Sequence, residues 1–267
     1  MKVHVLGSGS GGNAVVLESE RERVLVDAGF SPRMLSARMK QLDVAPESIS
    51  ALIVTHEHGD HVRGARFAAA RWKWPVYATP GTTEGYKFRR VPVAHLSPRR
   101  EVVLDDFSFK VIRTPHDALE PVAFVATARS SGARVGIAYD LGHVTERFAS
   151  HFLDVDILLL EANHDEDMLW AGPYPWIVKQ RIAGLHGHLS NAAAGVMARA
   201  CVHRGLRHIV LCHLSQTNNR PEVAISAVKA ALHGSGYRGT LQAASQDQPL
   251  SVSLGRAWRP AQMALEL

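Results

Sequence analysis

The sequence has very little cysteine, with only Cys201 and Cys212 among 267 residues. Two cysteines cannot form a disulfide framework, and neither belongs to a C-x-x-C pair. Hydrophobic runs are short, as in residues 157–160, where a membrane span needs roughly 18 apolar residues. The chain reaches Gly7 before the apolar region of a signal peptide could form. We therefore expect a cytoplasmic protein that does not enter a membrane.

The composition also lacks the extremes that mark non-globular chains. Hydrophobic residues make up 46% and charged residues 21%, which excludes disorder, collagen and coiled coil. Lysine and arginine exceed aspartate and glutamate by 30 − 25 = 5, and the pI is about 9.4. This charge suits an anionic partner such as nucleic acid, although many proteins carry it for solubility alone. Histidine, in contrast, is abundant, with 15 residues.

Short aliphatic or β-branched runs alternate with helical patterns along the chain. We expect strands at residues 2–6, 14–18, 24–26, 51–54, 107–112, 122–127, 134–139, 156–160 and 208–211. We expect helices at residues 33–42, 64–72, 190–204 and 222–233. The proline-rich segments 92–98 and 172–175 are predicted to be loops. This mixture indicates an α/β protein with mixed sheets, and we interpret residues 1–267 as a single domain.

The motif with the clearest chemistry is T-H-E-H-G-D-H at residues 55–61, directly after an expected strand. It places three imidazoles and one carboxylate within six residues: His56, His58, Asp60 and His61. Burying these groups together is costly unless a cation offsets the cost, and such donors suit Zn²⁺, Mn²⁺ or Fe²⁺. A solvated histidine-rich loop is the alternative, which the four-donor run makes much less favourable. The motif is neither the helical H-E-x-x-H of zincins nor part of a deaminase signature.

Other polar residues follow the carboxyl ends of expected strands, where α/β sheets assemble sites from distant parts of the chain. These residues are Asp27, His116, Asp140, Glu161 and His213. Each of these residues, taken alone, is more simply interpreted as a helix cap or as a loop residue whose side chain is hydrogen-bonded within the protein. Three of them, taken together with the motif, give seven candidate metal ligands: His56, His58, Asp60, His61, His116, Asp140 and His213.

This pattern resembles the metallo-β-lactamase-fold hydrolases, through V-D-A-G at Asp27, the T-H-E-H-G-D-H motif, and the three later ligands. The resemblance implies an αββα sandwich, in which two mixed β-sheets are flanked by helices, and two divalent metal ions, Zn or Mn. It assigns His56, His58 and His116 to one metal. It assigns Asp60, His61 and His213 to the other, with Asp140 as the bridge. Asp27 would lie behind the ligands and orient them, and we expect a similar supporting role for Glu161.

Five further motifs resemble the WalJ/YycJ-type branch of that family. They are G-S-G-S-G-G-N at 7–13, E-A-N-H-D at 161–165, G-P-Y-P-W at 172–176, G-H-L-S-N at 187–191 and H-L-S-Q-T-N-N at 213–219. That branch is regarded as a bacterial cytoplasmic nuclease acting on DNA 5′ ends, and it is similar to tRNA 3′-processing nucleases around His188 and His213. The resemblance therefore implies a 5′-to-3′ exonuclease, with DNA favoured over RNA as its partner. Residues 251–267 match no motif.

The predicted mechanism is two-metal phosphodiester hydrolysis, in which a metal-bridging water attacks phosphorus in line. Asp60 is predicted to orient that water and take its proton. His188 is left free of the metals and is predicted to contact the substrate. The similar histidine of tRNA-processing relatives is thought to stabilise the transition state or to protonate the leaving oxygen. A histidine that only braces the loop is the alternative. Predicted substrate contacts come from the glycine-rich loop, from the helix start near residue 190 and from the asparagines after His213. These contacts are Ser10, Asn13, His188, Ser190, Asn218 and Asn219. A tight turn is an equal alternative for the glycine-rich loop.

Three alternatives stay open. An RNA-processing nuclease of the same fold would use the same ligands, and so would a thioester or lactone hydrolase. Basic residues in the first half, such as Arg63, Arg66 and Arg71, favour a phosphodiester substrate. The remote alternative is an NAD-binding dehydrogenase, because G-x-G-x-x-G at 7–12 follows a strand. Two strand-like runs at 14–18 and 23–26 leave no room for the helix that this fingerprint requires.

Overall fold

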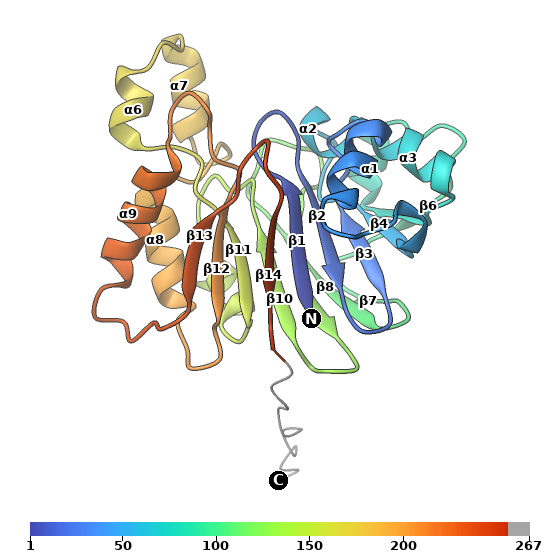
Figure 1. Ribbon diagram of the computed structural model, residues 1–267. Coiled ribbons are helices and arrows are strands. Elements are labelled where there is room, and N and C mark those ends of the chain that lie inside the picture. Colours follow the sequence, from blue (N-terminus) through green and yellow to red (C-terminus); the bar gives the residue numbers. More distant parts are fainter. Residues whose placement is uncertain (256–267) are drawn as a thin grey trace.

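The computed structural model describes residues 1–255, so the end of the motif-free stretch 251–267 lies outside the described residues. Two seven-stranded sheets form its centre (Figure 1). The first sheet has the order β14 (Leu250–Ser253), β1 (Lys2–Gly7), β2 (Ala14–Glu18), β3 (Arg23–Val26), β4 (Ala51–Ile53), β5 (Val76–Ala78), β6 (Val93–His95). The second has the order β13 (Thr240–Ala243), β12 (His208–Cys212), β11 (Ile157–Glu161), β10 (Arg134–Ala138), β9 (Val122–Ala128), β8 (Phe107–Arg113), β7 (Val102–Val103).

Both sheets are mixed. Strands β3 to β6 run parallel to one another, and so do β10 to β13. The remaining neighbours pair antiparallel. Parallel neighbours require crossover connections, which here carry helices that cover the outer faces of the sheets.

Helices cover the outer face of each sheet (Figure 1). The elements of the first half are α1 (Pro32–Lys40), the 3₁₀ helix η1 (Pro46–Ser48), α2 (Gly59–Val62), α3 (Ala65–Trp72) and α4 (Pro80–Gly85). Those of the second half are α5 (Glu146–Ala149), η2 (Ser150–Phe152), α6 (Glu166–Ala171), α7 (Trp176–Ala183), α8 (Asn191–Ala200) and α9 (Pro221–Leu232). The predicted αββα sandwich is confirmed. Among residues 1–255 there is no helix with the length and apolar character needed to cross a membrane.

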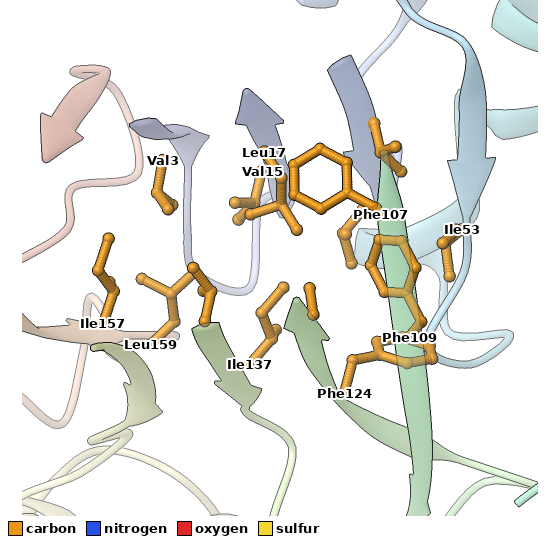
Figure 2. Close-up of a cluster of buried hydrophobic side chains, with 14 of the residues drawn as sticks. Val3, Val15, Leu17, Ile53, Phe107, Phe109, Phe124, Ile137, Ile157 and Leu159 are labelled. Carbon is orange, nitrogen blue, oxygen red and sulfur yellow. The ribbon is translucent and has the colours of Figure 1, made fainter. Parts of the chain in front are cut away.

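The main hydrophobic core lies between the two sheets (Figure 2). Val15 and Leu17 point into it from β2, and Phe107, Phe109 and Phe124 meet them from the second sheet. The residues between these positions face the other way and pack under the outer helices, as Val16 does under the helices of the first half. Because both faces of these strands are buried, the runs are almost continuously apolar, which is why the sequence predicts them well.

The predicted helices all occur, with α1, α3, α8 and α9 beginning and ending within a few residues of the expected bounds. Segment 172–175 is a loop, as predicted, between α6 and α7. The loop predicted for residues 92–98 is wrong in part, because Val93–His95 forms β6. This three-residue strand lies at the edge of its sheet with two exposed residues, so neither length nor burial marks it in the sequence.

The dehydrogenase alternative is also wrong. The glycine-rich turn leads into β2, which pairs antiparallel with β3 through Val15 opposite Val26 and Glu18 opposite Arg23. A dinucleotide-binding unit would have a helix and a parallel strand at this point. The turn serves a β-meander instead, and Gly12, with φ of 155°, adopts a conformation that side-chain-bearing residues rarely adopt.

Candidate metal and active site

The candidate site residues lie where the parallel strands of both sheets end. Asp27 follows β3, Asp140 follows Tyr139 at the end of β10, Glu161 ends β11, and His213 follows β12. The carboxyl ends of parallel strands lie at one edge of a sheet, so their side chains converge there. The two sheets meet at this edge, where His213 Nε2 lies 3.2 Å from Asp60 Oδ2.

Three of these residues adopt left-handed backbone conformations. The φ angles are 60° for Asp27, 58° for Asp140 and 55° for His213. Residues other than glycine rarely adopt this region, and holding them there costs of order 1 kcal/mol or more each. Surrounding hydrogen bonds hold the strained turns, including that from Asn163 Nδ2 to the His213 carbonyl oxygen at 2.9 Å. Each such turn directs a polar side chain into the site directly after a buried strand.

The first donor cluster is His56, His58 and His116, whose donor atoms all lie within 4.8 Å of one another. His116 Nδ1 donates to the Gly187 carbonyl oxygen at 3.0 Å, which leaves Nε2 to face His58 Nδ1 at 3.2 Å. His56 Nδ1 lies 3.0 Å from the Thr55 hydroxyl, and its buried Nε2 has no hydrogen-bond partner among residues 1–255. An unsatisfied buried nitrogen is costly unless a ligand completes it.

The second cluster is Asp60, His61 and His213. His61 Nδ1 donates a hydrogen bond to Asp27 Oδ2 at 2.8 Å. Its Nε2 is therefore the nitrogen that can bind a metal ion, and it lies 3.4 Å from Asp60 Oδ2. His213 Nδ1 faces Glu161 Oε1 at 3.1 Å, and its Nε2 faces Asp60. Ligands of one tetrahedral ion bound at 2.0–2.1 Å are about 3.3 Å apart. The two separations from Asp60 Oδ2, 3.2 Å to His213 Nε2 and 3.4 Å to His61 Nε2, match that value.

Asp140 lies between the two clusters. Its Oδ2 is 3.0 Å from His61 Nε2, and its Oδ1 is 3.3 Å from His213 Nδ1 and 3.8 Å from His116 Nε2. Oδ2 is buried and accepts no hydrogen bond from any residue that the structure describes. The carboxylate is thus in contact with both donor sets, as a bridging ligand would be. These imidazole and carboxylate donors fit divalent metal ions, and His56, His61, His116 and His213 are each held through the other ring nitrogen.

The electrostatics of the site favour positive charge. Burial opposes ionisation of Asp60, but His61 and His213 hold the pKa of this carboxyl well below its usual range. Burial would likewise lower the pKa of His213, yet Asp140, Asp60 and Glu161 raise it to about 10. The pKa of His56 is lowered by burial, which keeps this imidazole neutral as a ligand must be. The carboxylates therefore stabilise positive charge at the site. This charge is carried either by protonated histidines or by divalent cations that the neutral histidines bind.

Comparison with known proteins agrees with this arrangement. Residues 7–122 match the metallo-beta-lactamase superfamily. Exodeoxyribonuclease YycJ of Bacillus anthracis is 31% identical over 238 residues, 87% of this chain and 89% of that protein. Exodeoxyribonuclease WalJ of Streptococcus pneumoniae strain D39 is 32% identical over 231 residues, 84% of this chain and 85% of that protein. The metallo-beta-lactamase fold protein YhfI from Bacillus subtilis has a TM-score of 0.71 at 20% identity, covering 94% of this chain and 99% of that one.

The chain belongs to the metallo-β-lactamase superfamily. The predicted resemblance is therefore confirmed, including the likeness to the YycJ and WalJ proteins. The chain is a hydrolase of this superfamily, whose members use divalent metals, and the histidine and aspartate clusters could hold such ions. The assignment of individual ligands stays a prediction.

Several residues that hold this metallo-β-lactamase site together are absent from the sequence prediction. Tyr139 donates its hydroxyl to Asp27 Oδ2 at 3.0 Å, and the backbone N–H of Thr55 donates to Asp27 Oδ1 at 2.8 Å. The Ser8 hydroxyl accepts the His213 N–H at 2.8 Å. Thr55 and Tyr139 directly precede predicted ligands in the chain, and that adjacency is the signal that could have identified them. Asp27 lies behind His61, where it was predicted to act.

His188 lies at the edge of the donor clusters. Its Nδ1 donates to Glu161 Oε1 at 2.8 Å, and its ring centroid is 5.2 Å from that of His116 and 5.1 Å from that of His213. Glu161 also accepts the Leu141 N–H at 2.6 Å, so it fixes the loop as well as the imidazole. Burial opposes protonation, but the Glu161 carboxylate raises the pKa of His188 above its usual value. Since Nδ1 is engaged, Nε2 is the atom available to a substrate.

The glycine-rich loop does not present a free row of N–H groups. The Gly9 N–H donates to Asn13 Oδ1, the Gly11 N–H to Gln246 Oε1 and the Gly12 N–H to the Gly9 carbonyl oxygen. The loop is a closed turn, which agrees with the tight-turn alternative and not with a set of N–H groups open to a phosphate. Ser10 is exposed at its tip.

Three predicted substrate contacts are buried. Asn13 is 1% exposed, and its Nδ2 lies 3.1 Å from His61 Nε2 and 3.3 Å from Asp60 Oδ2, so it supports the ligands. Asn219 is bonded to the Ala162 carbonyl oxygen and the Asn191 side chain. Asn218 is fully buried. Asn13 and Asn219 are thus engaged within the protein, and direct contact of these asparagines with a strand end stays a prediction. Ser190 is the N-cap of α8, where its hydroxyl accepts the Ala193 N–H at 3.3 Å.

Proposed function

We propose that this hydrolase is a cytoplasmic, dinuclear-metal-dependent exonuclease that degrades DNA in the 5′-to-3′ direction. The observation that carries the proposal is the pair of donor clusters in contact with Asp140, beside a histidine held by Glu161. Two neighbouring cations suit in-line displacement at phosphorus, where charge develops on several oxygens at once. The names of the YycJ and WalJ relatives support DNA as the substrate.

The residues divide into ligands and supports. We assign His56, His58 and His116 to one ion, and Asp60, His61 and His213 to the other, with Asp140 between them. Zinc and manganese both suit imidazole with carboxylate donors. When bound, the ions would lower the pKa of a water molecule and neutralise charge on the phosphoryl oxygens. Asn13 and Asp27 hold the donor atoms of the second set in place.

Two side chains move protons in this proposal. Asp60 orients the attacking water and takes its proton, as the new bond forms between the water oxygen and phosphorus. The bond from phosphorus to the 3′ oxygen of the terminal nucleotide breaks. His188 donates the proton that this oxygen requires from its Nε2, and its proton-bearing form is favoured by Glu161.

A basic segment follows the H-x-H-x-D-H motif in the sequence. Arg63 follows two residues after His61, is exposed, and donates to the Gly11 carbonyl oxygen at 3.2 Å. Arg66 and Arg71 follow on α3, the latter exposed. Lysine and arginine supply most of the affinity for a phosphate backbone. This supports a nucleic-acid strand over a small thioester.

The test is a substrate panel with purified protein and Mn²⁺ or Zn²⁺. Single- and double-stranded DNA and RNA would carry a label at the 5′ end or the 3′ end. We expect DNA to be cleaved, with mononucleotides as the first products from the 5′ label. The 3′-labelled strand should shorten gradually.

Other outcomes would point elsewhere. Early internal fragments would make the protein an endonuclease, and faster cleavage of RNA would make it an RNA-processing enzyme. Rapid thioester or lactone cleavage with no nuclease activity would overturn the phosphodiesterase proposal altogether.

A further inference from the structure

A cavity of about 610 Å³ lies directly beside His188. Its walls come from residues 142–146, which follow β10, from α6 at Trp170, and from one face of α8. Cavities of this size accept small organic ligands. His188 lines this cavity and also lies next to His116 and His213, so a group bound in the cavity lies next to the metal-ligand clusters.

The chemistry of the lining indicates what the cavity would accept. Its floor is apolar, with Leu189, Ala193 and Met197. Among the described residues, no lysine or arginine lines the cavity. Two acidic residues, Glu146 and Glu166, do line it. A phosphate would be repelled there, because nothing offsets its charge. The cavity therefore suits an uncharged, flat and largely apolar group.

Two side chains add specificity for an aromatic heterocycle. Trp170 lines the cavity and is 42% exposed, so its ring can stack on a ligand. His164 also lines it, is 2% exposed, and its Nδ1 has no hydrogen-bond partner within residues 1–255. A buried polar atom without a partner is costly, and an occupant with ring nitrogens or amino groups would reduce that cost.

We propose that this cavity binds the base of the terminal nucleotide, whose 3′ oxygen leaves during cleavage. The inference rests on the proposed function, because it places that oxygen at His188. The sugar then enters the cavity mouth and the base reaches the apolar floor. The phosphates stay outside, on the side of the metal-ligand clusters. A cavity for a single base at this position would restrict cleavage to strand ends.

The test compares two identical substitutions at adjacent positions of α8. Ala193→Leu puts a larger side chain into the cavity, whereas Ala192→Leu changes an exposed residue that does not line it. The binding of deoxyadenosine would be followed by NMR titration in the presence of a chelator, so that no cleavage is needed. We expect Ala193→Leu to weaken binding about tenfold or more, as loss of base stacking commonly does. Ala192→Leu should bind like the unmodified protein.

Trp170→Ala is a second variant in case Ala193→Leu fails to fold, which thermal unfolding would show. It should also weaken deoxyadenosine binding. The proposal is overturned if the unmodified protein does not bind deoxyadenosine, or if the folded cavity variants bind it as well as Ala192→Leu does.

Cleavage assays separate this inference from the proposed function. On DNA whose terminal nucleotide lacks a base, the unmodified protein should show a higher KM than on normal DNA, and the cavity variants should lose this difference. Deoxyadenosine binding that the cavity variants weaken, without cleavage of any DNA, would refute the nuclease and leave the base-binding cavity in place. If all variants cleave DNA and show the same difference in KM between normal DNA and DNA that lacks the terminal base, the base-binding role of the cavity is refuted and the proposed nuclease is not.

Discussion

Replacing Asp60 by alanine is expected to abolish hydrolysis while the protein stays folded. The substitution removes a carboxylate oxygen that lies 3.2 Å from His213 Nε2 and 3.4 Å from His61 Nε2. It removes a predicted ligand and the predicted proton acceptor together. The loss should therefore exceed the roughly 10²–10⁴-fold that is usual for a general acid or base. The Asp60 side chain is 20% exposed, so the gap it leaves can be filled by water.

The rate would be measured on labelled DNA, and folding by circular dichroism and thermal unfolding. Asp105→Ala is a suitable control, because it removes an exposed carboxylate that follows β7. A folded Asp60→Ala protein with near-normal turnover would contradict the assignment.

His61→Ala is expected to abolish hydrolysis as well, but also to destabilise the fold. His61 is fully buried and bonded to the buried Asp27. Its removal leaves that buried carboxylate without the imidazole N–H that it accepts, and an unsatisfied buried acceptor commonly costs about 1–3 kcal/mol, or more when it is charged. Asp60→Ala is therefore the cleaner variant.

The second large effect is expected for His188→Ala. The imidazole is fixed by Glu161 and contributes no atom to the two assigned ligand sets. We expect this variant to retain both metals and to lose turnover by roughly 10²–10⁴-fold, as for a missing general acid. Metal content and rate would be measured on the same preparation, with the exposed neighbour His186→Ala as a control.

The metal content matters because His188 also lies near a third group of donors. Asp140, Glu161, His188 and His213 offer atoms within 4.8 Å of one another. Loss of one metal equivalent in His188→Ala would make this residue a ligand. An unchanged rate would make it a structural brace of the loop.

The sequence predicts the fold well, and it also identifies the candidate donors that the structure brings together, for a physical reason. Buried strands are continuous apolar runs, and a polar side chain that follows one directly, such as Asp140 or His213, is expected at the edge of the sheet. The H-x-H-x-D-H spacing places several metal-binding side chains together, and few purely structural roles require such a group. Both signals are local, so they are visible without the fold.

What the sequence could not predict depends on contacts between distant segments. Asn13 follows the glycine-rich turn, and only the fold shows that its amide is directed at His61 and Asp60. Asn218 and Asn219 are polar residues after a candidate ligand, yet the folded chain buries both. The cavity beside His188 combines residues from β10 to α8, so no single segment predicts it.

Metal titration of DNA cleavage tests the central claim most directly. Protein stripped of metal with a chelator would be titrated with Mn²⁺, and separately with Zn²⁺, while release of the 5′ terminal nucleotide is followed. Stripped protein should be inactive, and activity should reach its maximum at two bound ions per chain. Full activity at one ion per chain, or cleavage that survives complete metal removal, would contradict a dinuclear nuclease.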